Sequence, residues 1–128
     1  MRKEYRVPGQ AEPISHYTDA VEANGLLFVS GIVPVDADGR VIGGEDVVEQ
    51  ARQVFRNMAE VLAAAGAGFA DVVKVTVFLT DVDDRARINP VRQEVFGEAR
   101  PASTLVEISR LAIPGAKIEV ECVAALAR

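Results

Sequence analysis

Hydrophobic positions change their spacing several times along this chain, and the changes predict six strands and two helices. Apolar residues recur at helical spacing between positions 46 and 65, which predicts one long helix. Asp46 is suited to cap the N-terminus of this helix and Gly66 to end it. The most regular strand is predicted from Val72 to Leu79, where Val73, Val75, Val77 and Leu79 on the buried side alternate with Lys74, Thr76 and Phe78.

The other predicted elements are shorter and are bounded by turn residues. Asn24-Gly25 is typical of a two-residue hairpin turn. Asn89-Pro90 resembles an N-cap followed by proline at the first helical position, so we expect a short helix from Pro90 to Phe96. The predicted order is β-β-β-α-β-α-β-β in one α+β domain over residues 1–128. The other strands are expected at residues 2–7, 17–23, 26–30, 103–109 and 117–126.

Two helices cannot cover both faces of a six-stranded sheet. We therefore expect both helices on one face, and the other face solvated or buried by copies of the chain. The last strand fits this arrangement, because its residues divide between two faces. Ile118, Val120, Cys122 and Ala124 point one way, whereas Glu119, Glu121 and Val123 point the other.

Composition narrows the function classes. The net charge of −5 argues against nucleic-acid binding driven by phosphate neutralisation. One cysteine permits no internal disulfide, and one histidine with one cysteine does not make an ordinary zinc site. The sequence has no apolar span of membrane length and no export-type apolar segment at its start, so we expect a cytoplasmic protein without membrane contact.

Four stretches carry a family resemblance: SHYTDAV from Ser15, LFVSG from Leu27, VTVFLTD from Val75, and RPAST from Arg100 through to the later IEVE from Ile118. In this order and spacing the chain resembles the Rid family of reactive intermediate deaminases, also called YjgF or L-PSP proteins. The resemblance implies a chorismate-mutase-like fold, with a mixed six-stranded sheet and two helices on one face. It also implies a homotrimer with a barrel-like core and a pocket at each subunit interface. Members with the full site hydrolyse reactive 2-imino or enamino acids to 2-keto acids and ammonia, with no metal and no cofactor.

The resemblance also suggests site residues. Tyr17, Ser30, Gly31, Asn89 and Glu119 match family positions. Active family members carry Pro-Ala-Arg-Ser/Thr, in which the arginine binds the substrate carboxylate. Here the same place reads Pro-Ala-Ser-Thr, followed by leucine where a cysteine is often found; the three residues concerned are Ser103, Thr104 and Leu105.

Each candidate has an expected role. Imine hydrolysis needs a group that activates water and a weak acid that manages the proton, for which Glu119 and Tyr17 are the catalytic candidates. Serine and threonine hydroxyls lack the bidentate fork of arginine. Arg100 or Arg92 is therefore a candidate anchor for the carboxylate, the alternative being that both are solvated surface residues.

Two other residues near these positions are weaker candidates. His16 adjoins Tyr17, and its ordinary pKa suits proton transfer. Neighbours on a strand point to opposite faces, so the two side chains are not expected to share a pocket. Asn89 is expected to act more as a helix cap than as a ligand contact.

Three functions remain open. The first is hydrolytic deamination of a small reactive imine or enamine acid at inter-subunit pockets. The second is a non-catalytic trimer that binds a small carboxylate-containing metabolite, because Ser103 replaces the arginine. The third, ribonuclease activity, is disfavoured by the negative net charge.

Overall fold

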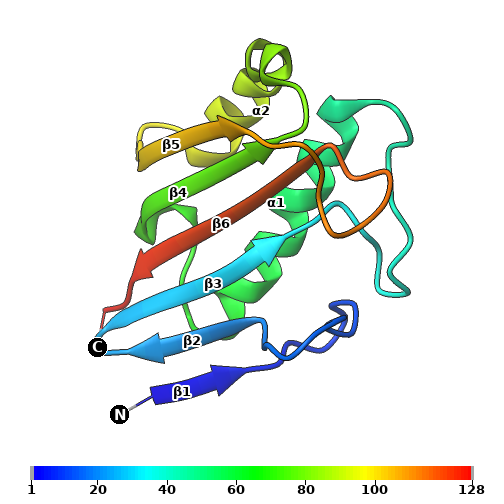
Figure 1. Ribbon diagram of the computed structural model, residues 1–128. Coiled ribbons are helices and arrows are strands. Elements are labelled where there is room, and N and C mark those ends of the chain that lie inside the picture. The colour runs from blue at the N-terminus through cyan, green and yellow to red at the C-terminus, as the bar shows by residue number, and fades with distance from the viewer. Residues whose placement is uncertain (1, 128) are drawn as a thin grey trace.

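A computed structural model describes residues 2–127 as one six-stranded sheet with two helices on one of its faces (Figure 1). The strand order is β1-β2-β3-β6-β4-β5. β4 and β5 are parallel, and the other neighbours are antiparallel. The elements are β1 (Arg2–Tyr5), β2 (Ala20–Ala23), β3 (Leu26–Ile32), α1 (Val47–Ala64), η1 (Phe69–Asp71), β4 (Val72–Leu79), η2 (Val82–Asp84), α2 (Arg85–Phe96), β5 (Ala102–Glu107) and β6 (Ile118–Ala125).

The predicted order of six strands and two helices is confirmed. Local signals fixed several boundaries correctly. The Asp46 side chain accepts a hydrogen bond from the N–H of Val48, as an N-cap should. Asn24 and Gly25 both have positive φ, at 52° and 77°, which the tight turn between β2 and β3 requires.

The start of α2 was predicted wrongly. The helix begins at Arg85, directly after η2, so Asn89 lies inside it and caps nothing. Pro90 is accommodated in the helix although it has no N–H to bond the carbonyl of Ala86. Both residues are exposed, so water can solvate that carbonyl. Burial of the apolar residues on the other side of the helix then outweighs the lost hydrogen bond.

The start of β2 was also predicted wrongly. Tyr17 lies in the loop between β1 and β2, and the strand begins three residues later at Ala20. A similar local departure occurs in β4, where a shift of register against β6 falls between Val72 and Lys74. This irregularity leaves Val72 buried and Val73 exposed, although the simple alternation placed Val73 with the buried residues.

The core lies between the sheet and the helices. The predicted inward residues of β6, from Ile118 to Ala124, are all buried. They meet the buried stripe of α1, which includes Val54, Met58 and Leu62. The opposite face of the sheet carries no helix (Figure 1). Phe28 and Val106, which point to that face, remain 46% and 38% exposed.

Candidate functional site

A cavity of about 390 Å³ opens between the N-terminal loop and the neighbouring ends of β3 and β6. Its wall brings together four predicted site residues from three separate segments. They are Tyr17, Ser30, Gly31 and Glu119. The rest of the wall is mainly apolar, with Ile14, Ile32 and Ile113 among its residues. A cavity with apolar walls and a few converging polar groups is the usual form of a small-molecule site.

Glu119 lies against the backbone of Gly31. A Cβ atom built at Gly31 would stand 2.7 Å from the carboxyl carbon of Glu119, closer than any ordinary contact. The absence of a side chain at Gly31 therefore makes room for the carboxylate. Burial raises the pKa of the Glu119 carboxyl, and the negative charge of Glu121 raises it further. Within residues 2–127 the carboxylate makes no hydrogen bond and no ion pair, so it is available to a ligand or to water.

Ser30 and Tyr17 differ in how firmly they are held. The Ser30 hydroxyl donates to the carbonyl of Thr18 at 2.6 Å, so its oxygen remains free to accept a hydrogen bond. The Ser30 N–H donates to the carbonyl of Asp19 at 3.0 Å. Tyr17 is 49% exposed and lies on the loop beside the cavity. His16 is exposed on the same loop and does not line the cavity.

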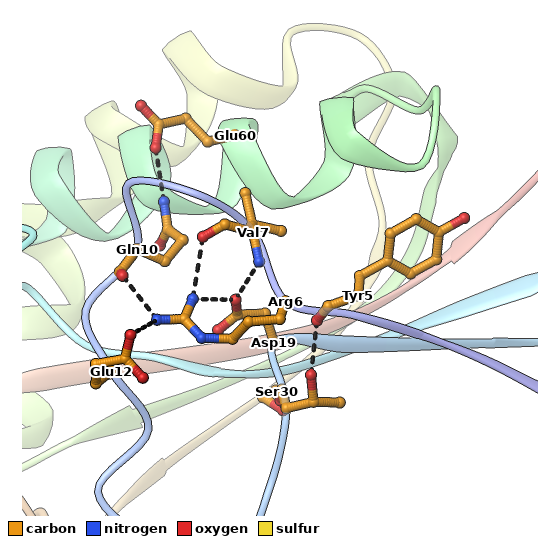
Figure 2. A network of polar contacts seen from close by, with 9 residues as sticks. Tyr5, Arg6, Val7, Gln10, Glu12, Asp19, Ser30 and Glu60 are labelled. Carbon is orange, nitrogen blue, oxygen red and sulfur yellow. Dashed lines mark hydrogen bonds and ion pairs between the residues drawn. The ribbon is translucent and has the colours of Figure 1, made fainter.

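A polar network fixes this loop to the sheet (Figure 2). Asp19 is buried and accepts hydrogen bonds from the N–H of Val7 at 2.7 Å and from Arg6 at 2.8 Å. Arg6 also donates to the carbonyl of Gln10 and forms an ion pair with Glu12. Sequence reasoning did not single out this aspartate, because no local pattern links it to residues 12 and 13 positions away. The network positions the segment that carries Tyr17.

Gln50 fixes the segment that leads into β6. It is fully buried in α1. Its amide nitrogen donates to the carbonyls of Gly44 and Gly115, at 2.8 and 3.0 Å, and its oxygen accepts from the N–H of Lys117 at 2.7 Å. Lys117 immediately precedes the strand that carries Glu119. A polar residue three positions after Val47, on the apolar side of a predicted helix, was the signal that could have revealed this role.

The remaining candidates lie at the β5 edge of the sheet. Ser103 points to the helix side, where its hydroxyl accepts a hydrogen bond from Nη2 of Arg92 at 2.7 Å. Arg92 is half-buried, and burial lowers the pKa of its guanidinium. Asn89 lies one helical turn before Arg92 and is exposed. Of the two arginines suggested from the sequence, Arg92 is therefore the one that reaches Ser103.

The other three residues of this group are placed differently. Thr104 points to the open face of the sheet, where its hydroxyl is 3.1 Å from Nζ of Lys74. Leu105 points to the helix side and packs against the core. Arg100 is exposed, and its side chain forms no hydrogen bond or ion pair within the described part of the chain.

The cavity residues and the β5 residues do not form one site within one chain. Glu119 pairs across the sheet with Phe78, which pairs with Val106, whereas Ser103 pairs with Val75 three residues away along β4. At about 3.3 Å per residue and 4.8 Å per strand, Ser103 is displaced by roughly 10 Å along the strands and 10 Å across them. Its side chain also points to the opposite face of the sheet.

Residues 2–127 present neither a metal site nor a membrane-spanning helix. No group of three histidine, cysteine, aspartate or glutamate side chains in residues 2–127 is arranged to hold a metal ion. No helix in this part of the chain is both long and apolar enough to cross a membrane.

Comparison with known proteins identifies the family. The model of the family described as Endoribonuclease L-PSP matches residues 9–126. A RutC family protein of Pyrococcus horikoshii is 43% identical over 114 residues, covering 88% of this chain and 89% of that protein. The chloroplastic Reactive Intermediate Deaminase A of Arabidopsis thaliana is 36% identical over 110 residues, covering 86% of this chain and 58% of that protein.

A solved structure agrees with this result. The crystal structure of Escherichia coli TdcF with bound serine superimposes with a TM-score of 0.86 at 31% identity, covering 97% of this chain and all of the other. The match thus extends over both the cavity and the β5 edge. The chain belongs to the Rid family of YjgF and L-PSP proteins.

Proposed function

We propose that this protein hydrolyses a small reactive 2-imino acid, or its enamine tautomer, to a 2-keto acid and ammonia. The observation that carries the proposal is the Glu119 carboxylate, which lies unpaired in the wall of an apolar cavity with a raised pKa. An acidic side chain of this kind is a candidate general base. The relationship to a reactive intermediate deaminase supports the same chemistry.

The reaction requires a positioned water molecule and no metal or cofactor. Glu119 accepts a proton from water while the water oxygen bonds to the imine carbon, and it passes that proton to the imine nitrogen. In the resulting carbinolamine Glu119 takes the hydroxyl proton and delivers it to the amino nitrogen, so that the carbonyl forms as the carbon–nitrogen bond breaks and ammonia leaves. Tyr17 is the candidate donor of a hydrogen bond to the departing nitrogen. Ser30, whose own proton is used by Thr18, can accept a hydrogen bond from the imine N–H.

The active form in this proposal is a homotrimer with its sites between subunits. Two features of the single chain support it. Glu119 and Ser103 point to opposite faces of the sheet and lie two strands apart, so a neighbouring copy is needed to bring their two groups together. The open face also exposes apolar side chains such as Phe28 and Val106, which association of copies would bury.

A second candidate is a trimer that binds a small carboxylate-containing metabolite without turning it over. Ser103 favours it, because a serine stands where the resemblance places the carboxylate-binding arginine. The related TdcF has been crystallised with serine, a small amino acid, in the bound state. In both proposals the protein is cytoplasmic. In both it also binds no nucleic acid, since its net charge of −5 disfavours phosphate contacts.

An oxidase-coupled assay separates the two candidates. L-amino-acid oxidase generates 2-imino acids from several amino acids, and the release of 2-keto acid is followed with and without the protein. We expect the protein to accelerate keto-acid release over buffer. In Glu119→Gln the rate of this catalysed release should fall by about 10²–10⁴-fold. Glu121→Gln, two residues along the same strand, is the matched control and should retain most of the activity at pH 8. No acceleration with any amino acid would refute the deaminase and favour metabolite binding.

A further inference from the structure

The half-buried side chain of Arg92 forms a single, exposed hydrogen bond among the described residues. It extends from α2 to the first half of β5, where Nη2 donates to the hydroxyl oxygen of Ser103 at 2.7 Å. Within residues 2–127 the side chain makes no other hydrogen bond and no ion pair. Four of its five N–H donors therefore lack a protein acceptor in the described chain.

This arrangement is suited to binding an anion, because the contact with Ser103 is exposed and a ligand can reach the remaining donors. Burial of a charged group is unfavourable unless the charge is paired, and burial here already lowers the pKa of Arg92. A serine hydroxyl is a neutral acceptor and does not compensate the charge. It does restrict where the guanidinium can point. A planar guanidinium fixed at one nitrogen still presents N–H groups in the fork geometry that a carboxylate accepts.

The surroundings of Arg92 fit a small carboxylate ligand better than a large anion. Asn89 lies on the same side of α2, one turn earlier, and its exposed side-chain amide makes no hydrogen bond within residues 2–127. No second basic side chain is hydrogen-bonded to Ser103 within residues 2–127, whereas a phosphate usually requires more positive charge. One guanidinium, one amide and one hydroxyl match the needs of a single carboxylate group.

We propose that Arg92 binds the substrate carboxylate and that Ser103 is a positioning residue that orients its guanidinium. The anchor thus comes from a helix and reaches over the strand position that carries an arginine in active relatives. The identity of the ligand in this inference rests on the proposed function. The negative charge of the ligand is inferred from Arg92 itself. It explains how a chain with serine at position 103 can still hold a 2-keto or 2-imino acid.

Binding of pyruvate, a small 2-keto acid, tests the anchor independently of turnover. Pyruvate is titrated into the full-length protein and the dissociation constant is measured by NMR. Arg92→Ala should weaken binding by at least about 30-fold, the effect expected when a carboxylate loses its charged partner. Arg100→Ala, which removes an exposed arginine eight residues away, is the matched control and should change binding less than twofold.

Relocating the charge is a sharper test. In Arg92→Ala/Ser103→Arg the guanidinium comes from the strand instead of the helix, and we expect binding within about fivefold of the unchanged protein. Ser103→Ala should raise the dissociation constant and KM about five- to tenfold and leave kcat nearly unchanged, because it loosens the anchor without removing it. Thermal unfolding and sedimentation establish that each variant folds and assembles. Arg92→Gln, which keeps the chain length, replaces Arg92→Ala if the latter does not assemble.

The outcomes for the anchor and for the deaminase are distinguishable. If folded Arg92 variants bind pyruvate as well as Arg100→Ala does, or if the unchanged protein binds no pyruvate at millimolar concentration, the anchor is refuted. Arg92-dependent binding without imine hydrolysis would support the anchor and refute the deaminase. Imine hydrolysis that is insensitive to Arg92→Ala would support the deaminase and refute the anchor.

Discussion

Replacement of Gly31 by alanine tests whether the Glu119 carboxylate must lie where the structure places it. The added Cβ would stand 2.7 Å from the carboxyl carbon and would overlap a carboxylate oxygen. The atoms it meets belong to the end of a flexible side chain, so we expect Glu119 to rotate away while the backbone stays in place. Gly31 has no positive φ, so alanine there is not strained by its backbone conformation.

The expected effects on stability and on activity therefore differ. Alanine in place of glycine lowers the conformational entropy of the unfolded chain, which raises the free energy of unfolding by about 0.4–1 kcal/mol. This gain offsets part of the cost of moving the carboxylate. We expect the free energy of unfolding to change by less than about 1 kcal/mol. A displacement of roughly 1 Å at a reacting group can lower the rate by about 100-fold, and the carboxylate must move at least that far.

The assay is oxidase-coupled release of 2-keto acid, measured beside urea unfolding of the same preparations. Gly68→Ala is the matched control, because Gly68 has ordinary extended dihedrals (φ −142°) and nothing lies within 4 Å of a Cβ built there. It should keep full activity. A folded Gly31→Ala variant with activity within twofold of the unchanged protein would show that the position of Glu119 is not critical, and the proposed catalytic role would fail.

Three further predictions concern charge and burial. The general base must be deprotonated, so activity should decrease at pH values below the raised pKa of Glu119. Glu121→Gln removes a negative charge that raises this pKa, so it should move the acidic limb of the kcat/KM profile to lower pH. An unmoved limb would contradict the assignment of Glu119 as the base. Burial raises the pKa of the Cys122 thiol to about 12, so a thiol reagent at pH 8 should label it only in denaturant, and rapid labelling of the native protein would contradict its burial. Asp19→Ala leaves the N–H of Val7 without its acceptor and should cost about 2–3 kcal/mol in urea unfolding, whereas a change below about 0.5 kcal/mol would show that the network contributes little.

Local periodicity was sufficient for most of the fold. The apolar stripe and the Asp46 cap identified α1, and alternation identified β4 and the two faces of β6. These features depend on residues within a few positions of one another, so the sequence carries them directly. The same local rules failed at α2, where Pro90 suggested a helix start. Burial of Ile88 and Val91 against the core extends the helix back to Arg85.

In the candidate site, too, some features followed from the sequence and others only from the packing of the elements. Family resemblance supplied the identities of Tyr17, Ser30 and Glu119, and the structure places all three at one cavity. Sequence reasoning left open whether Arg92 or Arg100 approaches Ser103, and the structure shows that it is Arg92. A helix and a strand must pack together before that pair can meet, and no spacing rule covers such a contact.

By itself the sequence determined the order of the elements, the buried stripe of the long helix and the unusual serine at position 103. Only the tertiary structure decided that Glu119 lies against Gly31 and that Arg92 reaches Ser103. The physical reason is the range of the interactions. Periodicity and capping act over a few residues, whereas these contacts join residues 88 and 11 positions apart through the packing of the whole sheet.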